Sequence, residues 1–229
     1  MKLWFLLLFI GLLSCDKDQT VAFYGDENRR QINYLALGDS YTIGQSVCTT
    51  CRFPEQLKAN LQATYPNNPF LLQVVAKTGW TTTNLLTEIN LVNPSTNFDL
   101  VTLLIGVNNQ YQNRPFSLYE TEFPQLVAKA VTLANGDKTN VIVVSIPDYA
   151  YTPFGQGAVN ISAAIDQYNA FAKNYCVENQ ITFVNITDIT RLGLSQPELV
   201  ANDGLHPSEL AYSKFVERIL PRALLSLGD

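Results

Sequence analysis

The sequence predicts one α/β domain built around a buried parallel sheet of about five strands. Apolar, β-rich runs alternate with amphipathic stretches from about residue 31 to the end of the chain, which is the α/β pattern. Several of these runs are too continuously apolar to have a solvated face, as is typical of strands in a buried parallel sheet. With 229 residues, 47% of them hydrophobic, the chain is long enough to bury a sizeable core.

Each element follows from local pattern. The predicted strands cover residues 32–37, 71–76, 100–105, 141–146 and 182–185. Helical spacing predicts helices over residues 54–64, 82–90, 118–134, 159–179 and 208–225. Pro54 suits the start of its helix, Asn135-Gly136 suits a helix end, and Ser208 or the residue before it opens the last helix.

The first residues have the character of an export signal. Lys2 supplies a positive charge, residues 3–13 are apolar, and Ser14-Cys15 follows. This run is shorter than the roughly 20 residues that span a bilayer as a helix. We expect a signal peptide over 1–14, a polar tether over 15–30 and the folded domain over 31–229.

Ser14-Cys15 resembles the lipobox of bacterial lipoproteins. The resemblance implies lipidation of Cys15 and a lipid-anchored protein of the bacterial cell envelope that faces the periplasm or the exterior. An ordinary secretory peptide that happens to end in a cysteine is the alternative.

Net charge restricts the partners. The formal charge is -5, and loss of a leader that contains Lys2 leaves 14 basic residues against 20 acidic ones. This balance argues against a nucleic-acid partner. We expect a monomer that acts on a small-molecule or glycan-borne substrate.

Three cysteines remain beyond Cys15. An exported protein can keep disulfides, so Cys48-Thr49-Thr50-Cys51 can close a small loop, while a redox motif and a zinc site are alternatives. Cys176 suits a buried thiol in the core.

Distinctive polar or small residues follow the first three strands. Ser40 lies in Gly38-Asp39-Ser40-Tyr41, Gly79 follows the second strand, and Asn108 follows the third. The carboxyl ends of parallel strands share one sheet edge, where crevices form beside a switch in strand order. His206 is the only histidine, three residues after Asp203. A serine, a histidine and an aspartate together indicate acyl transfer.

Four ordered blocks carry a family resemblance, and the resemblance runs from about residue 32 to the end. The blocks Gly38-Asp39-Ser40-Tyr41, Thr78-Gly79-Trp80, Gly106-Val107-Asn108-Asn109 and Asp203-Gly204-Leu205-His206-Pro207 resemble those of the SGNH hydrolases, the GDSL-type esterases and lipases. The resemblance implies a three-layer α/β/α sandwich with a flavodoxin-like sheet.

The same resemblance implies the role of each residue. Ser40 is the nucleophile, His206 the general base and then acid, and Asp203 the group that orients the imidazole. The backbone N–H groups of Ser40 and Gly79 and the side chain of Asn108 form the oxyanion hole. No metal and no cofactor are implied.

The chain departs from the family pattern at one place. The third block usually ends in aspartate, and Asn109 stands there instead. Because the catalytic asparagine is retained, we expect altered local hydrogen bonding rather than lost chemistry. Asp39 is interpreted as a residue that shapes the loop by bonding neighbouring backbone amides.

The leading functional hypothesis is a serine esterase that cleaves acyl or acetyl esters through an acyl-enzyme. Taken singly, each of these residues also suits a structural role: Ser40 a helix cap, Gly79 a tight turn, Asn108 a satisfied loop amide. A binding or scaffold lipoprotein with a vestigial triad is therefore the main alternative, and a redox protein built on Cys48 and Cys51 ranks last.

The aromatic residues of the 149–155 loop suit either a cleft wall or packing over the sheet edge.

Overall fold

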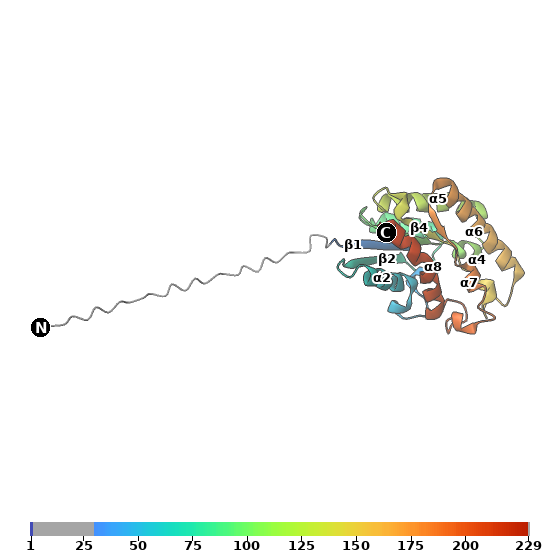
Figure 1. Ribbon diagram of the computed structural model, residues 1–229. Helices are drawn as coiled ribbons and strands as arrows, with labels where there is room; N and C mark the ends of the chain where they lie inside the picture. The colour runs from blue at the N-terminus through green and yellow to red at the C-terminus, as the bar shows by residue number, and fades with distance from the viewer. Residues whose placement is uncertain (2–29, 229) are drawn as a thin grey trace.

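The computed structural model describes residue 1 and residues 30–228. All of the predicted signal peptide but its first residue, and all of the tether but its last, lie outside the described residues, and Cys15 is among them. The rest forms the predicted α/β fold, with a parallel sheet flanked by helices on both faces (Figure 1).

The sheet has five parallel strands in the order β2-β1-β3-β4-β5. The strands are β1 (Ile32–Gly38), β2 (Phe70–Ala76), β3 (Leu100–Leu104), β4 (Val141–Val144) and β5 (Thr182–Val184). The chain moves from β1 outward to β2 and then returns past β1 to β3, so the strand order switches beside β1. Crevices form at the carboxyl edge of such a switch point.

The register puts the ends of three strands level with one another. Gly38 at the end of β1 pairs with Ala76 of β2 and with Leu104 of β3. The segments that follow these residues carry Ser40, Gly79 and Asn108. Parallel pairing thus collects three distant segments at one edge of the sheet.

The major helices form the two outer layers. They are α2 (Phe53–Thr64), α3 (Thr82–Val92), α5 (Phe116–Leu133), α6 (Val159–Asn179) and α8 (Glu209–Leu227). Helices α2 and α8 pack against each other on one face, while α3, α5 and α6 cover the other (Figure 1). Strands β3 and β4 are buried along their whole length, whereas β2 is an edge strand with only Val75 fully buried.

The predicted strands and long helices agree with the structure to within about two residues at each boundary. Pro54 lies in the first turn of α2, and Ser208 caps α8 by accepting a hydrogen bond from the Ala211 N–H at 3.2 Å. Asn135 and Gly136 follow α5 with positive φ, as expected of a helix end. None of the helices in the described part of the chain has the length and apolar composition needed to cross a bilayer.

Short elements lie outside the predictions. These are the helices α1 (Ser40–Ile43), α4 (Val107–Tyr111) and α7 (Thr187–Thr190) and the 3₁₀ turns η1 (Thr49–Cys51), η2 (Lys138–Asn140), η3 (Tyr149–Tyr151) and η4 (Pro197–Leu199). A segment of three to five residues is too short to show hydrophobic periodicity. Two of these elements, α1 and α4, begin at predicted site residues or directly beside them.

Candidate active site

Ser40 stands at a sharp transition from strand to helix. It is the first residue of α1, two residues after β1 ends at Gly38. The first backbone N–H groups of a helix have no partner within the helix, so the Ser40 N–H is free of the α1 ladder. A Cβ at Gly38 would lie 2.1 Å from Thr42 Oγ1 and 2.4 Å from the Leu104 carbonyl oxygen. Only glycine allows the turn to approach β3 this closely.

Asp39 caps the same helix. Its Oδ1 accepts the Tyr41 backbone N–H at 3.0 Å, which confirms its predicted loop-shaping role. Burial removes the carboxyl from water and raises its pKa to about 7, against the weaker lowering effect of the backbone hydrogen bonds. Asp39 thus shapes the turn that carries Ser40, the predicted nucleophile.

Asp203 and His206 lie in the loop between η4 and α8. Asp203 Oδ1 accepts the backbone N–H groups of Leu205 at 3.0 Å and His206 at 2.9 Å. Asp203 Oδ2 lies 2.6 Å from His206 Nδ1. Burial alone raises the pKa of Asp203, but hydrogen bonds led by that of Ser46 hold it well below its usual range. An ionised Asp203 directs the imidazole so that Nε2 is left as the free, basic nitrogen.

Residues from the two ends of the domain meet at one cavity of about 190 Å³. Ser40, Gly79, Asn108 and His206 all line it. The remaining lining residues are Tyr41, Thr78, Val107, Tyr111, Tyr149, Phe154 and Leu205. Ser40 and His206 share this cavity without a direct hydrogen bond between their side chains in this structure. Catalytic hydrogen bonds are often long before substrate binds.

The two predicted oxyanion-hole loops are tied together. Asn108 Nδ2 donates to the Trp80 carbonyl oxygen at 3.0 Å, and Gln112 Nε2 donates to the Gly79 carbonyl oxygen at 2.8 Å. Gly79 has a φ of +83°, and a Cβ there would meet nothing within 4 Å, so its backbone faces open space. The Asn108 amide keeps a second N–H for another acceptor. This arrangement can present two donors to one oxyanion.

Asn109 takes part in a buried polar network behind the site. Its Oδ1 accepts the Thr82 N–H at 2.9 Å, and its Nδ2 donates to Thr82 Oγ1 at 2.6 Å. Thr82 Oγ1 in turn donates to the buried carboxylate of Glu122 on α5. The expected change in local hydrogen bonding is therefore present. Glu122 supplies a carboxylate that the third block itself lacks.

This network predicts the effect of restoring the family residue. Asn109→Asp places a second carboxylate beside Glu122 and removes the donor to Thr82 Oγ1. We expect the free energy of unfolding to fall by about 1 to 3 kcal/mol, as for a buried polar group that loses its partner. Urea unfolding measures this change in the free energy of unfolding. Adding Glu122→Gln restores a donor and removes the like charge, so the double variant should recover most of the loss. A double variant as unstable as the sum of both singles contradicts this account.

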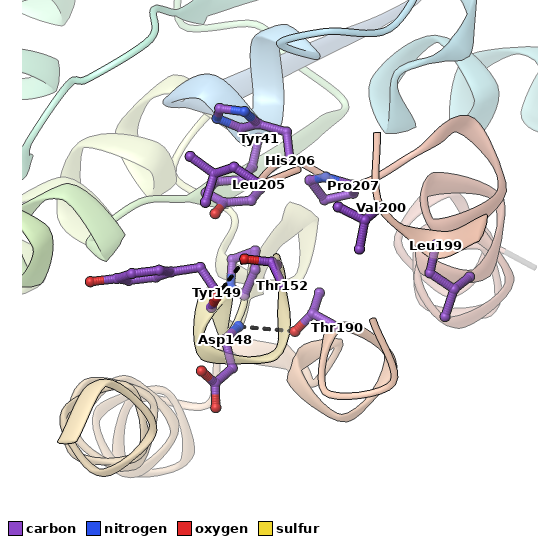
Figure 2. Close-up of a pocket in the computed structure, with 11 residues that line it drawn as sticks. Tyr41, Asp148, Tyr149, Thr152, Thr190, Leu199, Val200, Leu205, His206 and Pro207 are labelled. Atoms are coloured by element: carbon purple, nitrogen blue, oxygen red, sulfur yellow. Dashed lines mark hydrogen bonds between the residues drawn. The ribbon is translucent and has the colours of Figure 1, made fainter. Parts of the chain in front are cut away.

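The loop after β4 forms one wall of the site. Tyr149 and Phe154 line the 190 Å³ cavity, and Tyr151 is not among its lining residues. A second cavity of about 10 Å³ shares Tyr149, Leu205 and His206 with the first, and Asp148 and Thr152 also line it (Figure 2). The cleft-wall interpretation therefore holds for Tyr149 and Phe154. Trp80 does not line the cavity but packs half-buried against the core.

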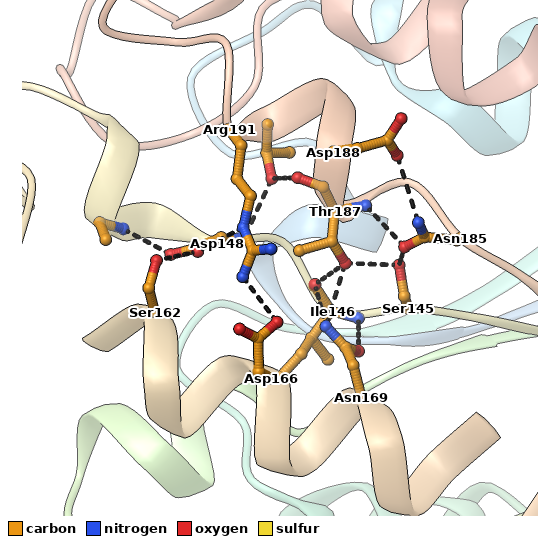
Figure 3. A network of polar contacts seen from close by, with 12 residues as sticks. Ser145, Ile146, Asp148, Ser162, Asp166, Asn169, Asn185, Thr187, Asp188 and Arg191 are labelled. Atoms are coloured by element: carbon orange, nitrogen blue, oxygen red, sulfur yellow. Dashed lines mark hydrogen bonds and ion pairs between the residues drawn. The ribbon is translucent and has the colours of Figure 1, made fainter. Parts of the chain in front are cut away.

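A polar network that sequence reasoning missed holds this wall in place (Figure 3). Asp148 is fully buried and bonds the Ala150 N–H at 3.0 Å and Arg191 Nε at 2.9 Å. Arg191 also reaches Asp166 Oδ1 at 2.7 Å. One signal for it was present, because Asp148 is a charged residue directly after an apolar strand and a proline. Its partner Arg191 carried no such signal.

The three cysteines in the described part of the chain form one disulfide and one free thiol. Cys48 and Cys51 are bonded, so the loop interpretation is confirmed, and both sulfurs are occupied. Within the described residues no three His, Cys, Asp or Glu side chains gather as a metal-binding group. Cys176 is buried, and burial raises the pKa of its thiol to about 12, as expected of a core residue.

Comparisons with known proteins agree with this geometry. The model of the GDSL-like lipase/acylhydrolase family matches residues 36–214. No curated protein matches the chain.

Several solved structures share the fold. Axe2, an acetylxylan esterase from Geobacillus stearothermophilus, has a TM-score of 0.63 at 20% identity, with 88% of this chain and 96% of that chain covered. A lipase/acylhydrolase from Enterococcus faecalis has a TM-score of 0.65 at 17% identity, covering 86% and 96%. The esterase EstA from Pseudoalteromonas sp., inhibited by monoethylphosphonate, has a TM-score of 0.60 at 16% identity, covering 86% and 99%.

Proposed function

Because this chain belongs to the GDSL-like lipase/acylhydrolase family, we propose that it is a serine esterase that hydrolyses carboxylic esters through an acyl-enzyme. One observation carries the proposal. A single cavity is lined by four residues that lie far apart in the sequence, namely Ser40, Gly79, Asn108 and His206. Asp203 also contacts the imidazole, with its Oδ2 at 2.6 Å from His206 Nδ1. A structural role for each residue taken singly does not account for this convergence.

The first half of the reaction forms the acyl-enzyme. His206 Nε2 takes the proton of Ser40 Oγ as that oxygen attacks the ester carbonyl carbon. The negative charge that develops on the carbonyl oxygen is met by the N–H groups of Ser40 and Gly79 and by the Asn108 amide. The bond to the alcohol oxygen then breaks, and His206 gives its proton to the departing alcohol.

The second half regenerates the enzyme. His206 Nε2 takes a proton from water, whose oxygen attacks the acyl carbon, and the collapse of the intermediate returns the proton to Ser40. Asp203 stabilises the imidazolium that forms transiently in both halves. These steps need only the residues named and water.

The size of the cavity supports a short acyl group as part of this proposal. Its volume of about 190 Å³ is below the range of sites that enclose drug-sized ligands. Phe154 and Tyr111 are half exposed at the cavity and offer apolar faces to the alcohol part of the substrate. We therefore propose acetyl or other short-chain esters, on small molecules or on glycans, as substrates. With Cys15 lipidated, the enzyme works at the bacterial cell envelope.

A phosphonate probe tests the catalytic function. Purified protein should hydrolyse p-nitrophenyl acetate faster than the decanoate ester, and a fluorophosphonate should label it covalently at Ser40, as read by peptide mass spectrometry. Labelling requires an activated hydroxyl, because an ordinary serine does not react. Folded protein that neither hydrolyses esters nor takes the label contradicts the proposal and favours the binding-module alternative.

A further inference from the structure

Ser46 contacts the predicted catalytic carboxylate from outside the family blocks. Its hydroxyl donates to Asp203 Oδ2 at 2.6 Å, across a separation of 157 residues. Asp203 Oδ2 is also the oxygen that bonds His206 Nδ1. The Ser46 side chain thus joins the segment that leaves α1 to the loop that carries His206.

The backbone presents Ser46 in an unusual conformation. Its φ is +68°, in the left-handed region that residues other than glycine, asparagine and aspartate rarely adopt. Conformations of this kind cost energy and persist where surrounding structure holds them, often at functional sites. Contacts that hold Ser46 in this conformation are present in the structure.

Two contacts and a disulfide hold the segment. The Gln45 N–H donates to the Ser40 carbonyl oxygen at 3.0 Å, and Gln45 Oε1 accepts the Thr78 hydroxyl at 2.7 Å. The Cys48–Cys51 disulfide closes the turn just after Ser46. The hydroxyl is therefore positioned by the same segment that carries the nucleophile.

The four hydrogen bonds of Asp203 divide into two kinds. The two backbone N–H groups on Oδ1 fix the orientation of the carboxylate without Ser46. Ser46 and His206 instead share Oδ2. A protonated imidazole forms a stronger hydrogen bond from Nδ1–H to Oδ2. This weakens the hydrogen bond that Ser46 donates to the same oxygen. The Ser46 bond is strongest while the imidazole is neutral.

We propose that Ser46 is a positioning residue that tunes the basicity of His206 through Asp203, keeping the imidazole neutral to lower pH than Asp203 alone allows. The effect of Ser46 on catalysis rests on the proposed esterase function. Its effect on the titration of His206 does not depend on that function.

Other ionisable groups face the imidazole but do not share Oδ2. Tyr41 of α1 packs its ring 5.3 Å from that of His206, and Tyr149 of η3 lines the same cavities. Burial raises the pKa of both phenols, so they stay uncharged through neutral pH. Asp148 lines the small cavity but is paired with Arg191. A change at Ser46 alters none of these groups directly.

The single histidine permits a direct test. An untagged full chain gives one imidazole C2–H resonance, and its NMR pH titration measures His206 without any need for turnover. Ser46→Gly removes the hydroxyl and tolerates the positive φ. We expect the titration midpoint to rise by about 0.5 pH unit, the size expected when one of several competing hydrogen bonds is lost. Ser46→Ala should give the same rise.

The matched control is Asn93→Gly. Asn93 also has a positive φ, of 44°, and it caps α3 away from Asp203. Its substitution should leave the midpoint unchanged. A midpoint in Ser46→Gly that stays within about 0.1 pH unit of the wild type, or that falls, overturns the proposal.

Kinetics give a second readout. If the protein is an esterase, the acid limb of kcat/KM in Ser46→Gly should move to higher pH by the same amount, while the alkaline plateau changes less than about threefold. A plateau that collapses with no shift of the limb shows a purely structural role and contradicts the tuning role. If the wild type hydrolyses no ester, the esterase proposal fails, and the NMR titration still decides the role of Ser46.

Discussion

Ser40→Ala and His206→Ala are each expected to lower kcat for p-nitrophenyl acetate by about four to six orders of magnitude. Ser40 lines the cavity together with the imidazole and the predicted oxyanion donors, and apart from Thr78 and the phenols it supplies the only hydroxyl there. Removing His206 leaves Ser40 protonated, with no other histidine in the chain to replace the base.

The losses of activity in the two single variants should not be additive. Because Ser40 and His206 act as one unit, the double variant should be about as slow as either single one. Ser195→Ala is a matched control, since Ser195 is exposed and its hydroxyl bonds only the nearby Leu192 carbonyl oxygen. It should keep wild-type kcat. Either catalytic variant retaining more than a tenth of the activity contradicts the triad.

Asp203→Asn is expected to lower kcat/KM near neutral pH by about three to four orders of magnitude. The two backbone N–H groups that bond Asp203 Oδ1 require an acceptor there, so the amide oxygen of the substituted side chain takes that place. The amide NH2 then points at His206 Nδ1, which has to accept. The imidazole proton moves to Nε2, and the nitrogen that faces Ser40 can no longer act as a base.

The tautomer itself can be observed. Nitrogen-15 shifts of the single histidine should show protonation at Nδ1 in the wild type and at Nε2 in Asp203→Asn. Asp137→Asn is the control, because Asp137 likewise accepts a backbone N–H, that of Thr139 at 2.8 Å, but far from the site. A loss below tenfold in Asp203→Asn, or an unchanged tautomer, contradicts the proposed role of Asp203.

Both predictions depend on residues that the sequence identifies by pattern. The strands that end at Gly38 and Leu104 are mostly apolar, with Asn33 and Thr102 as the polar exceptions, and such runs indicate a sheet buried on both faces. Ser40 and Asn108 follow these strands within four residues, so their position at one edge of the sheet follows from parallel pairing. The family blocks then supply the chemistry.

Three features escaped the sequence because their partners are distant. Ser46 bonds Asp203, Asp148 bonds Arg191, and Glu122 completes the network of Thr82. Ser46 and Glu122 are ordinary polar residues in their local context, and the position of Asp148 after an apolar strand did not identify its partner. Its role appears only once a second segment packs beside it, and no periodicity within one segment encodes that partner.

The sequence alone determined the fold class, the order of its long elements, and the set of residues that resembles a hydrolase site, because apolar periodicity and short blocks are local properties of the chain. Tertiary structure alone decided how those residues are supported. It brought Ser46 to the shared oxygen of Asp203, placed Tyr149 and Phe154 on the cavity wall, and gave Asn109 its carboxylate neighbour. Those contacts depend on which segments share an edge or a face after packing, and packing is a property of the whole chain.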